Sequence, residues 1–230
     1  EFEFQDTEDQ ANVTSELLFD LNSGLPMDRL ICGDVGFGKT EVALRGAFNV
    51  AMSGAQVAFI VPTTLLCSQH YENFTKRFKN FPLKVDQISR LNSTSENNKI
   101  IERINSGESD VVVGTHALLN SKIKFKKLGM LIIDEEQHFG VSQKEKIKSL
   151  RSNVHVLALT ATPIPRTLQM SLVGLRDLSI ISTAPLNRQN INTEVIDFND
   201  EKIISAIEYE LSRNGQVYYV CPRINELKEV

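Results

Sequence analysis

The sequence of 230 residues lacks any long apolar run. Its longest apolar stretches, at residues 56–61 and 130–133, end well before the roughly 18 residues that a membrane-spanning helix requires. The acidic first ten residues also lack the basic-then-apolar pattern of a secretory signal. We therefore expect no membrane contact and a cytoplasmic location.

Cysteine is scarce as well. Cys32, Cys67 and Cys221 are odd in number and widely spaced, which argues against both a disulfide framework and a zinc cluster. We expect ordinary buried thiols.

An excess of positive charge is also absent, because the formal net charge is -4. A local basic groove is enough to contact nucleic-acid phosphates, so net charge does not exclude a nucleic-acid partner. Three basic runs, at residues 76–79, 122–127 and 144–151, are more typical of solvated surfaces. The composition, 41% hydrophobic and 23% charged, is that of a folded globular chain.

Apolar stretches alternate with helical ones, which predicts an α/β fold with a mostly parallel sheet covered by helices on both faces. Strands are predicted at residues 29–32, 56–61, 84–88, 110–114, 130–134, 154–160 and 178–181. Helices are predicted at residues 8–22, 39–52, 65–78, 96–106, 143–150 and 166–173. Gly24, Gly54 and Gly107 follow three of these helices, where a left-handed cap favours glycine.

A change of pattern near residues 183–189 predicts a linker. We assign residues 1–186 to a first lobe and residues 187–230 to a linker and the start of a second lobe. This second segment is predicted to contain strands at 192–197 and 216–220 and a helix at 201–212. About forty residues rarely form an independent core, so we expect a truncated domain.

A phosphate-binding loop is predicted between the strand at 29–32 and the helix at 39–52, because it matches G-x-x-x-x-G-K-[ST]. The loop consists of Gly33, Asp34, Val35, Gly36, Phe37, Gly38, Lys39 and Thr40. Its glycines let backbone N–H groups face phosphates, Lys39 reaches the β and γ phosphates of ATP, and Thr40 ligates Mg²⁺. A plain glycine-rich turn is the alternative, but it gives no reason for this spacing between a strand and a helix.

Carboxylates follow the predicted strand at 130–134, at the end where ligands bind in open α/β sheets. We predict that Asp134 holds Mg²⁺ and that Glu135 orients and deprotonates the water that attacks the γ phosphate. A solvated acidic turn is the alternative, although it is improbable beside a phosphate loop. Asp followed by Glu separates ATP-hydrolysing motors from small-molecule kinases, which need no water activator.

Several segments occur in the order found in superfamily 2 helicases. Residues 27–43 resemble motif I, 61–64 motif Ia, 114–116 motif Ib, 134–137 motif II and 160–162 motif III. Residues 163–168 are similar to a stretch shared by the transcription-repair-coupling factor and RecG families, and Phe37 with Glu41 favours the former. The resemblance implies a RecA-like lobe in which Glu41 joins the phosphate loop in binding nucleotide.

The resemblance also identifies residues 7–10 as a Q motif, with Gln10 reading the adenine edge and Phe4 packing near the base. Thr7 and Gln10 equally fit a capping box, in which they satisfy free backbone N–H groups at a helix start. The two roles are compatible, and both stay open at the level of the sequence.

Motif II departs from the family pattern, which often has histidine where this chain has Gln137. The resemblance implies that Gln137 couples the nucleotide state to Thr160 or Thr162 of motif III. The histidines themselves are more typical of packed or exposed side chains than of ligands. They are His70, His116, His138 and His155.

Candidate DNA contacts lie, by resemblance, in loops at strand ends, where hydroxyls, backbone N–H groups and arginines contact phosphate rather than bases. They are Pro62, Thr63, Thr64, Arg90, Gly114, Thr115, His116 and Arg166. Few aromatic residues alternate with basic ones, so a base-stacking platform for single strands is not expected. Double-stranded DNA is the predicted partner.

The resemblance implies an ATP-driven DNA translocase that displaces stalled RNA polymerase and recruits excision-repair proteins through domains outside this chain. The alternatives are RecG-like remodelling of replication forks and a non-motor phosphate-loop module. Hydrolysis needs an arginine from a second lobe, of which residues 215–220 resemble only the opening strand, near motif IV. We therefore expect the isolated chain to bind nucleotide weakly and to hydrolyse it slowly or not at all.

Overall fold

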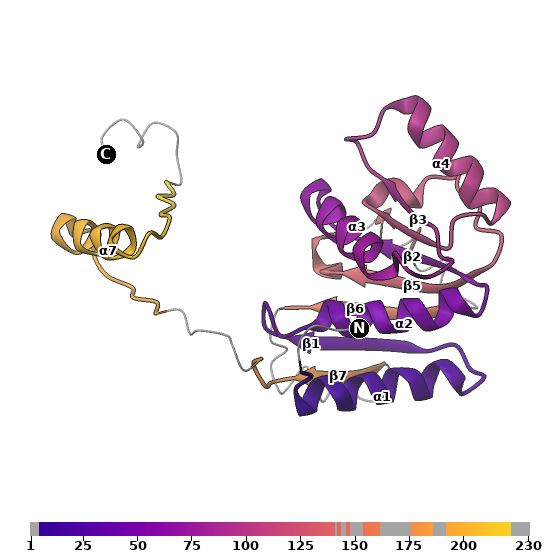
Figure 1. The fold of residues 1–230 in the computed structure, drawn as a ribbon, viewed down its shortest axis with the longest axis horizontal. Coiled ribbons are helices and arrows are strands. Elements are labelled where there is room, and N and C mark those ends of the chain that lie inside the picture. Colours follow the sequence, from indigo (N-terminus) through magenta and orange to yellow (C-terminus); the bar gives the residue numbers. More distant parts are fainter. Residues whose placement is uncertain are drawn as a thin grey trace. The chain divides into compact units, whose positions relative to one another are not determined.

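The computed structural model describes residues 5–140, 142–143, 146–147, 154–161, 176–185 and 192–221. The chain divides into two compact units, residues 1–188 and residues 189–230 (Figure 1). The assignment of these units to two motor lobes stays a prediction. Among the described residues, no helix is long and apolar enough to cross a membrane.

The first unit is built on a seven-stranded parallel sheet with the strand order β3-β4-β2-β5-β6-β1-β7. The strands are β1 (Asp28–Gly33), β2 (Gln56–Ile60), β3 (Val85–Ile88), β4 (Val111–Gly114), β5 (Leu128–Asp134), β6 (His155–Thr160) and β7 (Asp177–Ile181). The seven predicted strands and the α/β class are confirmed. Because β5, β6 and β1 are neighbours and parallel, their carboxyl ends meet at one edge of the sheet (Figure 1).

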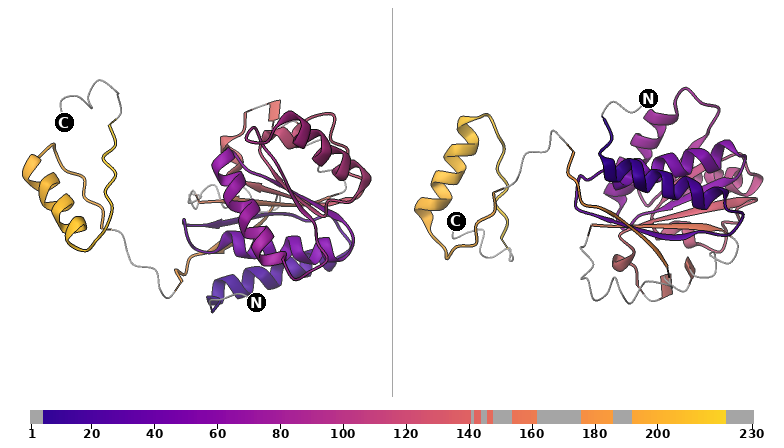
Figure 2. Two further views of the ribbon diagram at one scale, coloured as in Figure 1. Left: turned by 45° about the horizontal axis from the view of Figure 1, so that its top comes forward. Right: turned by 90° about the horizontal axis from the view of Figure 1, so that it is seen from below.

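Helices cover both faces of this sheet (Figure 2). The helices are α1 (Glu8–Asn22), α2 (Lys39–Met52), α3 (Thr64–Phe78), α4 (Thr94–Ser106) and the 3-10 helix η1 (His116–Leu119). The first three share a core with one face, and α4 and η1 share a core with the other. Along β5 the side chains alternate accordingly, since Met130 and Ile132 enter the first core and Leu131 and Ile133 the second.

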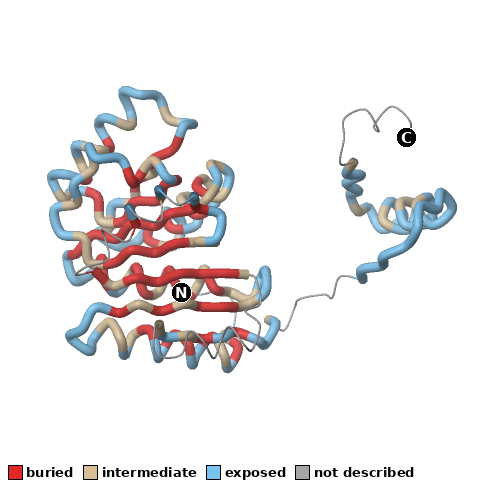
Figure 3. The backbone as a smooth tube through the Cα atoms, turned by 180° about the vertical axis from the view of Figure 1, so that it is seen from behind, coloured by how far each residue is buried: buried red, intermediate tan, exposed pale blue. Residues whose placement is uncertain are grey.

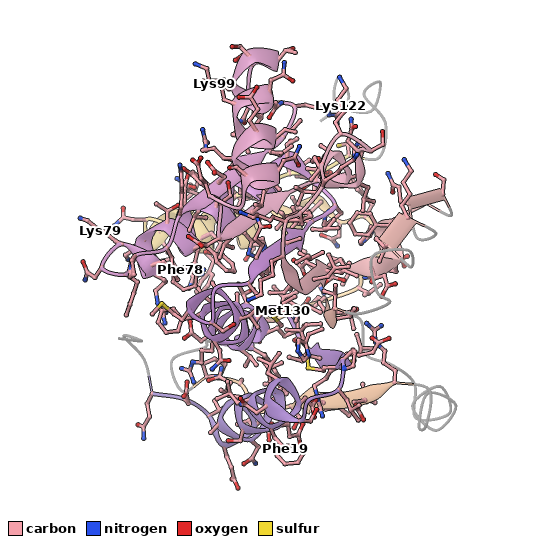
Figure 4. All side chains as sticks on the ribbon, turned by 90° about the vertical axis from the view of Figure 1, so that its right-hand side faces the viewer. Phe19, Phe78, Lys79, Lys99, Lys122 and Met130 are labelled. Atoms are coloured by element: carbon pink, nitrogen blue, oxygen red, sulfur yellow. The ribbon has the colours of Figure 1, made fainter. Side chains whose placement is uncertain are left out.

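The strands are buried over most of their length, whereas the exposed residues lie mainly in loops and on outer helix faces (Figure 3). Burial on both faces explains why these strands are continuous apolar runs without polar alternation. Lys79, Lys99 and Lys122 are exposed at the periphery, while Met130 lies in the interior (Figure 4). These three lysines thus occupy solvated surfaces.

Local signals set the helix ends at or near the predicted positions, although α3 begins at Thr64 and α4 at Thr94, slightly before the predicted starts at residues 65 and 96. Thr7 caps α1 in a capping box with Gln10. Of the two roles expected for Gln10, helix capping is therefore confirmed. Gly24, Gly54 and Gly107 have φ angles of 79°, 78° and 83°, in the left-handed region that favours glycine. The predicted helix at 143–150 is described only at 142–143 and 146–147, which are helical, and the one at 166–173 lies outside the described residues.

The second unit confirms the predicted helix but not the predicted strands. Helix α7 spans Asp200–Ser212, whereas residues 192–197 and 216–220 are not strands. A strand requires a neighbour for its backbone hydrogen bonds, and no described residue of this unit pairs in a ladder. No described residue of the unit is buried, so here an apolar pattern alone did not produce a sheet.

Candidate nucleotide site

The phosphate loop joins the end of β1 to the start of α2, at the edge of the sheet where β5 and β6 also end. Gly36 and Gly38 have φ angles of 81° and 83°, and Gly38 is the N-cap of α2. Asp34 and Val35 are exposed at the tip, whereas Phe37 packs against the core. The loop is therefore anchored on one side and open at the helix N-terminus, where backbone N–H groups favour an anion.

Lys39 folds back into this loop. Its Nζ donates to the carbonyl oxygen of Gly33 at 2.6 Å and to that of Asp34 at 3.0 Å. Burial lowers the pKa of Lys39, while the negative charges of Glu135 and Asp134 oppose that shift. The ammonium group thus lies in the field of both motif II carboxylates, and it is anchored by two uncharged carbonyl groups.

Gln10 connects the first helix to the loop. Its Oε1 accepts from the backbone N–H of Thr7 at 3.0 Å, and its Nε2 donates to the carbonyl oxygen of Phe37 at 2.9 Å. The side chain also fills the space beside Gly38, so that no side chain fits there. Adenine recognition by Gln10 stays a prediction, and Phe4 lies outside the described residues.

Glu135 lies directly after β5 with φ 50° and ψ 56°, a left-handed conformation that is uncommon outside glycine. Its carboxylate accepts from the backbone N–H of Ala161 at 2.9 Å and from the Thr160 hydroxyl at 3.4 Å. Gln137 donates from its Nε2 to the same carboxylate. Motifs II and III are therefore joined directly at Glu135.

This geometry modifies the predicted coupling through Gln137. The hydrogen bonds from Gln137 and from Thr160 both end on Glu135, so Gln137 contacts the carboxylate that stands between it and motif III. Thr162 lies outside the described residues. The sequence order of these motifs did not indicate that hydrogen bonds from Gln137 and from motif III would meet on the carboxylate of Glu135.

Comparison with known proteins agrees with this arrangement of motifs. The family model of the DEAD/DEAH box helicases matches residues 7–171, which include the loop, Glu135 and Thr160. The chain belongs to the DEAD/DEAH box helicase family. Its sequence is 52% identical over 233 residues to the transcription-repair-coupling factor of Rickettsia bellii (strain RML369-C), covering 100% of this chain and 21% of that protein.

Other members of the helicase family show the same likeness. The transcription-repair-coupling factor of Bacillus subtilis (strain 168) is 50% identical over 227 residues, covering 99% of this chain and 19% of that protein. The chain thus spans about one fifth of the length of these relatives. Among solved structures, RecG bound to a three-way DNA junction matches with a TM-score of 0.81 and 33% identity, over 99% of this chain and 31% of that chain.

The residues predicted to hold magnesium, Thr40 and Asp134, carry oxygen atoms of a suitable kind. Thr40 is half-buried in the first turn of α2, and Asp134 ends β5 with a side chain that is mostly buried. Hydroxyl and carboxylate oxygens are hard ligands of the type that magnesium prefers. Among the described residues, no cluster of three or more histidine, cysteine or acidic side chains forms a candidate metal site.

Glu41, which was expected to bind nucleotide, has its carboxylate directed elsewhere. Arg77 donates two hydrogen bonds of 2.8 Å to it, and Arg45 donates one of 3.1 Å. The side chain of Glu41 therefore ties α2 to α3. Both of its oxygens accept from arginine, and its contact with the nucleotide stays a prediction.

The predicted DNA contacts fall into two groups. The hydroxyls of Thr63 and Thr115 accept from backbone N–H groups at the starts of α3 and η1, so they cap helices. Gly114 lies against Leu118, and the close packing leaves no room for a side chain. The other described candidates, which are not buried, are Pro62, Thr64, Arg90 and His116, and Arg166 lies outside the described residues.

His70 is the site residue that sequence reasoning missed, since it was expected to be an ordinary packed or exposed histidine. Its Nε2 lies 3.3 Å from Oδ2 of Asp134. Nothing in the local pattern of α3 indicates this contact, because the two residues are 64 positions apart and meet only when α3 packs on the sheet.

Proposed function

We propose that this chain is the ATP-binding lobe of a double-stranded DNA translocase that displaces stalled RNA polymerase and couples transcription to nucleotide excision repair. The observation that carries the proposal is 50–53% identity to transcription-repair-coupling factors over essentially the whole chain. The Lys39 contacts within the phosphate loop and the hydrogen bond between motifs II and III support it. Polymerase and repair proteins would contact segments outside this chain. A bacterial translocase acting on chromosomal DNA works in the cytoplasm.

The proposed mechanism assigns separate tasks to the described residues. The loop from Gly33 to Thr40 holds the phosphates through backbone N–H groups, and Lys39 neutralises charge on the β and γ phosphates. Thr40 and Asp134 would hold Mg²⁺, which would supply charge stabilisation at the phosphates. Glu135 orients the attacking water and accepts its proton.

Glu135 also provides a route from hydrolysis to movement. Its carboxylate holds Ala161 and Thr160, so a change in its hydrogen bonding alters the start of the segment that follows β6. Loops at this edge carry the proposed contacts to DNA phosphates, which are independent of sequence. We infer that motif III senses the nucleotide state through Glu135.

Remodelling of DNA junctions in the manner of RecG is the second candidate. It is favoured by the TM-score of 0.81 to RecG bound to a three-way junction. The identity to RecG is 33%, against 50–53% for the transcription-repair-coupling factors. The coupling function is therefore the stronger proposal.

The nucleotide site is tested by comparing the ATP affinity of the chain with that of Lys39→Ala. We expect a loss of about tenfold or more, because a charged hydrogen bond contributes about 1.5 to 3 kcal/mol. Lys79→Ala is the matched control, since Lys79 is exposed at the end of α3, and it should bind like the parent. Unchanged affinity in Lys39→Ala would contradict the site.

The motor function is tested in the longer protein with Glu135→Gln. This variant should bind ATP but lose hydrolysis and the displacement of a stalled RNA polymerase from DNA. The coupling proposal is refuted if displacement continues in the absence of hydrolysis. It is also refuted if the parent protein hydrolyses ATP but leaves stalled polymerase in place.

A further inference from the structure

His70 occupies a buried position in α3 next to motif II. Its side chain is 9% exposed and that of Asp134 is 14% exposed, and His70 Nε2 lies 3.3 Å from Asp134 Oδ2. The imidazole ring packs on Phe59 of β2, with ring centroids 4.6 Å apart and planes inclined by 38°. Phe59 is itself fully buried and also contacts Phe74 of α3. One face of the imidazole ring thus packs on Phe59, and its Nε2 edge is directed toward the Asp134 carboxylate.

The partner defines which ring nitrogen carries hydrogen. An ionised carboxylate only accepts hydrogen bonds, so Nε2 must be the donor toward Asp134. A neutral imidazole with hydrogen on Nε2 satisfies this contact without any change of charge. One oxygen of Asp134 is thereby occupied by the protein, and the carboxylate retains its other oxygen as a ligand.

A restraint on Asp134 matters because the Lys39 ammonium group attracts its negative charge. Lys39 Nζ itself is held by the carbonyl oxygens of Gly33 and Asp34, at 2.6 Å and 3.0 Å. A carboxylate free to rotate could pair with the Lys39 ammonium and so withdraw an oxygen from the metal. A donor fixed by packing on Phe59 opposes that rotation.

We propose that His70 is a positioning residue that holds the Asp134 carboxylate in the orientation required to bind the magnesium of the nucleotide complex. This inference rests on the proposed ATP-binding function, and it adds a residue that lies outside motifs I, II and III. Partners that hydrogen-bond a ligating carboxylate set its geometry, and their loss commonly costs roughly ten- to a hundredfold in metal affinity or activity.

The test measures binding of fluorescent N-methylanthraniloyl-ATP by the 230-residue chain, with MgCl₂ and with EDTA in its place. The informative ratio is the affinity with magnesium divided by the affinity without it. His70→Phe keeps a ring against Phe59 but has no donor, and it should lower this ratio by roughly tenfold while leaving magnesium-free binding unchanged.

Two further variants separate the hydrogen bond from packing. His70→Gln places an amide N–H at about the reach of Nε2 and should restore the ratio, whereas the shorter His70→Asn should not. Phe74→Leu disturbs the same aromatic cluster without touching Asp134, and it should leave the ratio unchanged. Thermal unfolding of each variant identifies any that fails to fold. If His70→Phe does not fold, the comparison of His70→Gln with His70→Asn still tests the role of the hydrogen bond.

The outcomes distinguish the two proposals. If the parent chain binds the probe and Asp134→Asn loses the magnesium effect, an unchanged ratio in both His70→Phe and His70→Asn overturns the role of His70 and leaves the proposed function intact. If the parent binds no probe with or without magnesium, or Lys39→Ala binds as well as the parent, the nucleotide site itself fails and the role of His70 fails with it.

Discussion

A side chain at Gly38 would meet two separate obstacles, which makes this residue the most constrained in the phosphate loop. Its φ angle of 83° is unfavourable for any residue with a Cβ atom, and that atom would collide with the Nε2 amide of Gln10. Gly36 has a similar φ angle of 81°, but a Cβ atom there would meet no atom within 4 Å. A side chain at Gly36 would therefore meet backbone strain alone, whereas one at Gly38 would meet both backbone strain and a steric clash.

We predict that Gly38→Ala is more destabilising than Gly36→Ala. The latter should cost about 1 kcal/mol of backbone strain, and the former should exceed it because Gln10 must also move. Urea unfolding of the two variants measures the difference in the free energy of unfolding. Equal costs for the two substitutions would show that Gln10 does not constrain the loop.

His155 gives a pH dependence at the scale of one residue. Its Nδ1 accepts from the backbone N–H of Met27 at 3.2 Å, which requires that nitrogen to be unprotonated. Burial lowers the pKa of His155, and the charge of Asp20 opposes this only in part. Below about pH 6.5 the unfolded chain therefore binds a proton that the folded chain resists, so stability falls as pH falls.

The free energy of unfolding should accordingly decrease between neutral pH and pH 5.5, and it should decrease less in His155→Asn. The asparagine keeps a hydrogen-bond acceptor at about the reach of Nδ1 but does not titrate. Urea unfolding at several pH values measures both curves. If the two curves run parallel, another group is responsible for the pH dependence.

At the scale of elements, the start of α1 is fastened to the end of β7. The Oδ2 atom of Asp9 accepts from the backbone N–H groups and hydroxyls of Ser182 and Thr183, at distances of 2.8 to 2.9 Å. Hydrogen bonds from Thr183 and then Ser182 lower the pKa of Asp9. The helix that carries Gln10 thus also holds the segment that leaves the first unit.

We predict that Asp9→Ala removes hydrogen-exchange protection at the amides of Ser182 and Thr183. Glu8→Ala is the matched control, because Glu8 is an exposed acidic residue in the same first turn. Mass spectrometry of exchange in the peptide around these residues gives the measurement. Since the pKa of Asp9 is lowered, protection should be present above about pH 4 and be lost as the pH falls further. If protection at these amides persists in Asp9→Ala, the hydrogen bonds to Asp9 are not what holds this segment.

At the scale of the whole molecule, the two units differ in how much they bury. The first unit contains two cores on the two faces of its sheet, whereas the described residues of the second unit are half-buried or exposed. Large apolar residues such as Val195, Phe198 and Tyr218 are exposed there. Such surface is typical of an interface, which agrees with our proposal that the unit is the start of a second lobe.

We predict that the 230-residue chain alone has no DNA-stimulated ATPase activity. Hydrolysis in such motors requires an arginine from the second lobe, a contribution of several orders of magnitude in rate. Phosphate release with and without double-stranded DNA measures this, and the longer protein is the positive control. Robust stimulation by DNA in the isolated chain would show that one lobe suffices and would disprove the two-lobe requirement.

The three cysteines differ in how far they are buried. Cys32 and Cys67 are buried, as expected, and Cys221 is half-buried. Burial raises the pKa of Cys32 to about 11 and also raises that of Cys67. Ordinary thiols were predictable from number and spacing, but the degree of burial depends on the strands and helices around each residue.

The elements of the first unit and the conformation of the phosphate loop followed from the sequence alone, because apolar runs, helix caps and glycine conformations depend on residues close together in the chain. Thr7 with Gln10, Gly107 after α4 and the loop at Gly33 to Thr40 are all of this kind. The same local reasoning failed at residues 192–197 and 216–220, where a strand needs a partner that no local pattern supplies.

The contacts around the loop, motif II and motif III depend on tertiary packing and could not be read from the sequence. Contacts between distant residues arise when parallel strands place their carboxyl ends at one edge and helices pack beneath it. Gln10 thereby meets Phe37, Glu135 meets Ala161, and His70 meets Asp134. Glu41 pairs with Arg77 for the same reason. The packing of α2 beside α3 brings the two side chains together, and the position of Glu41 directly after the loop does not indicate this contact.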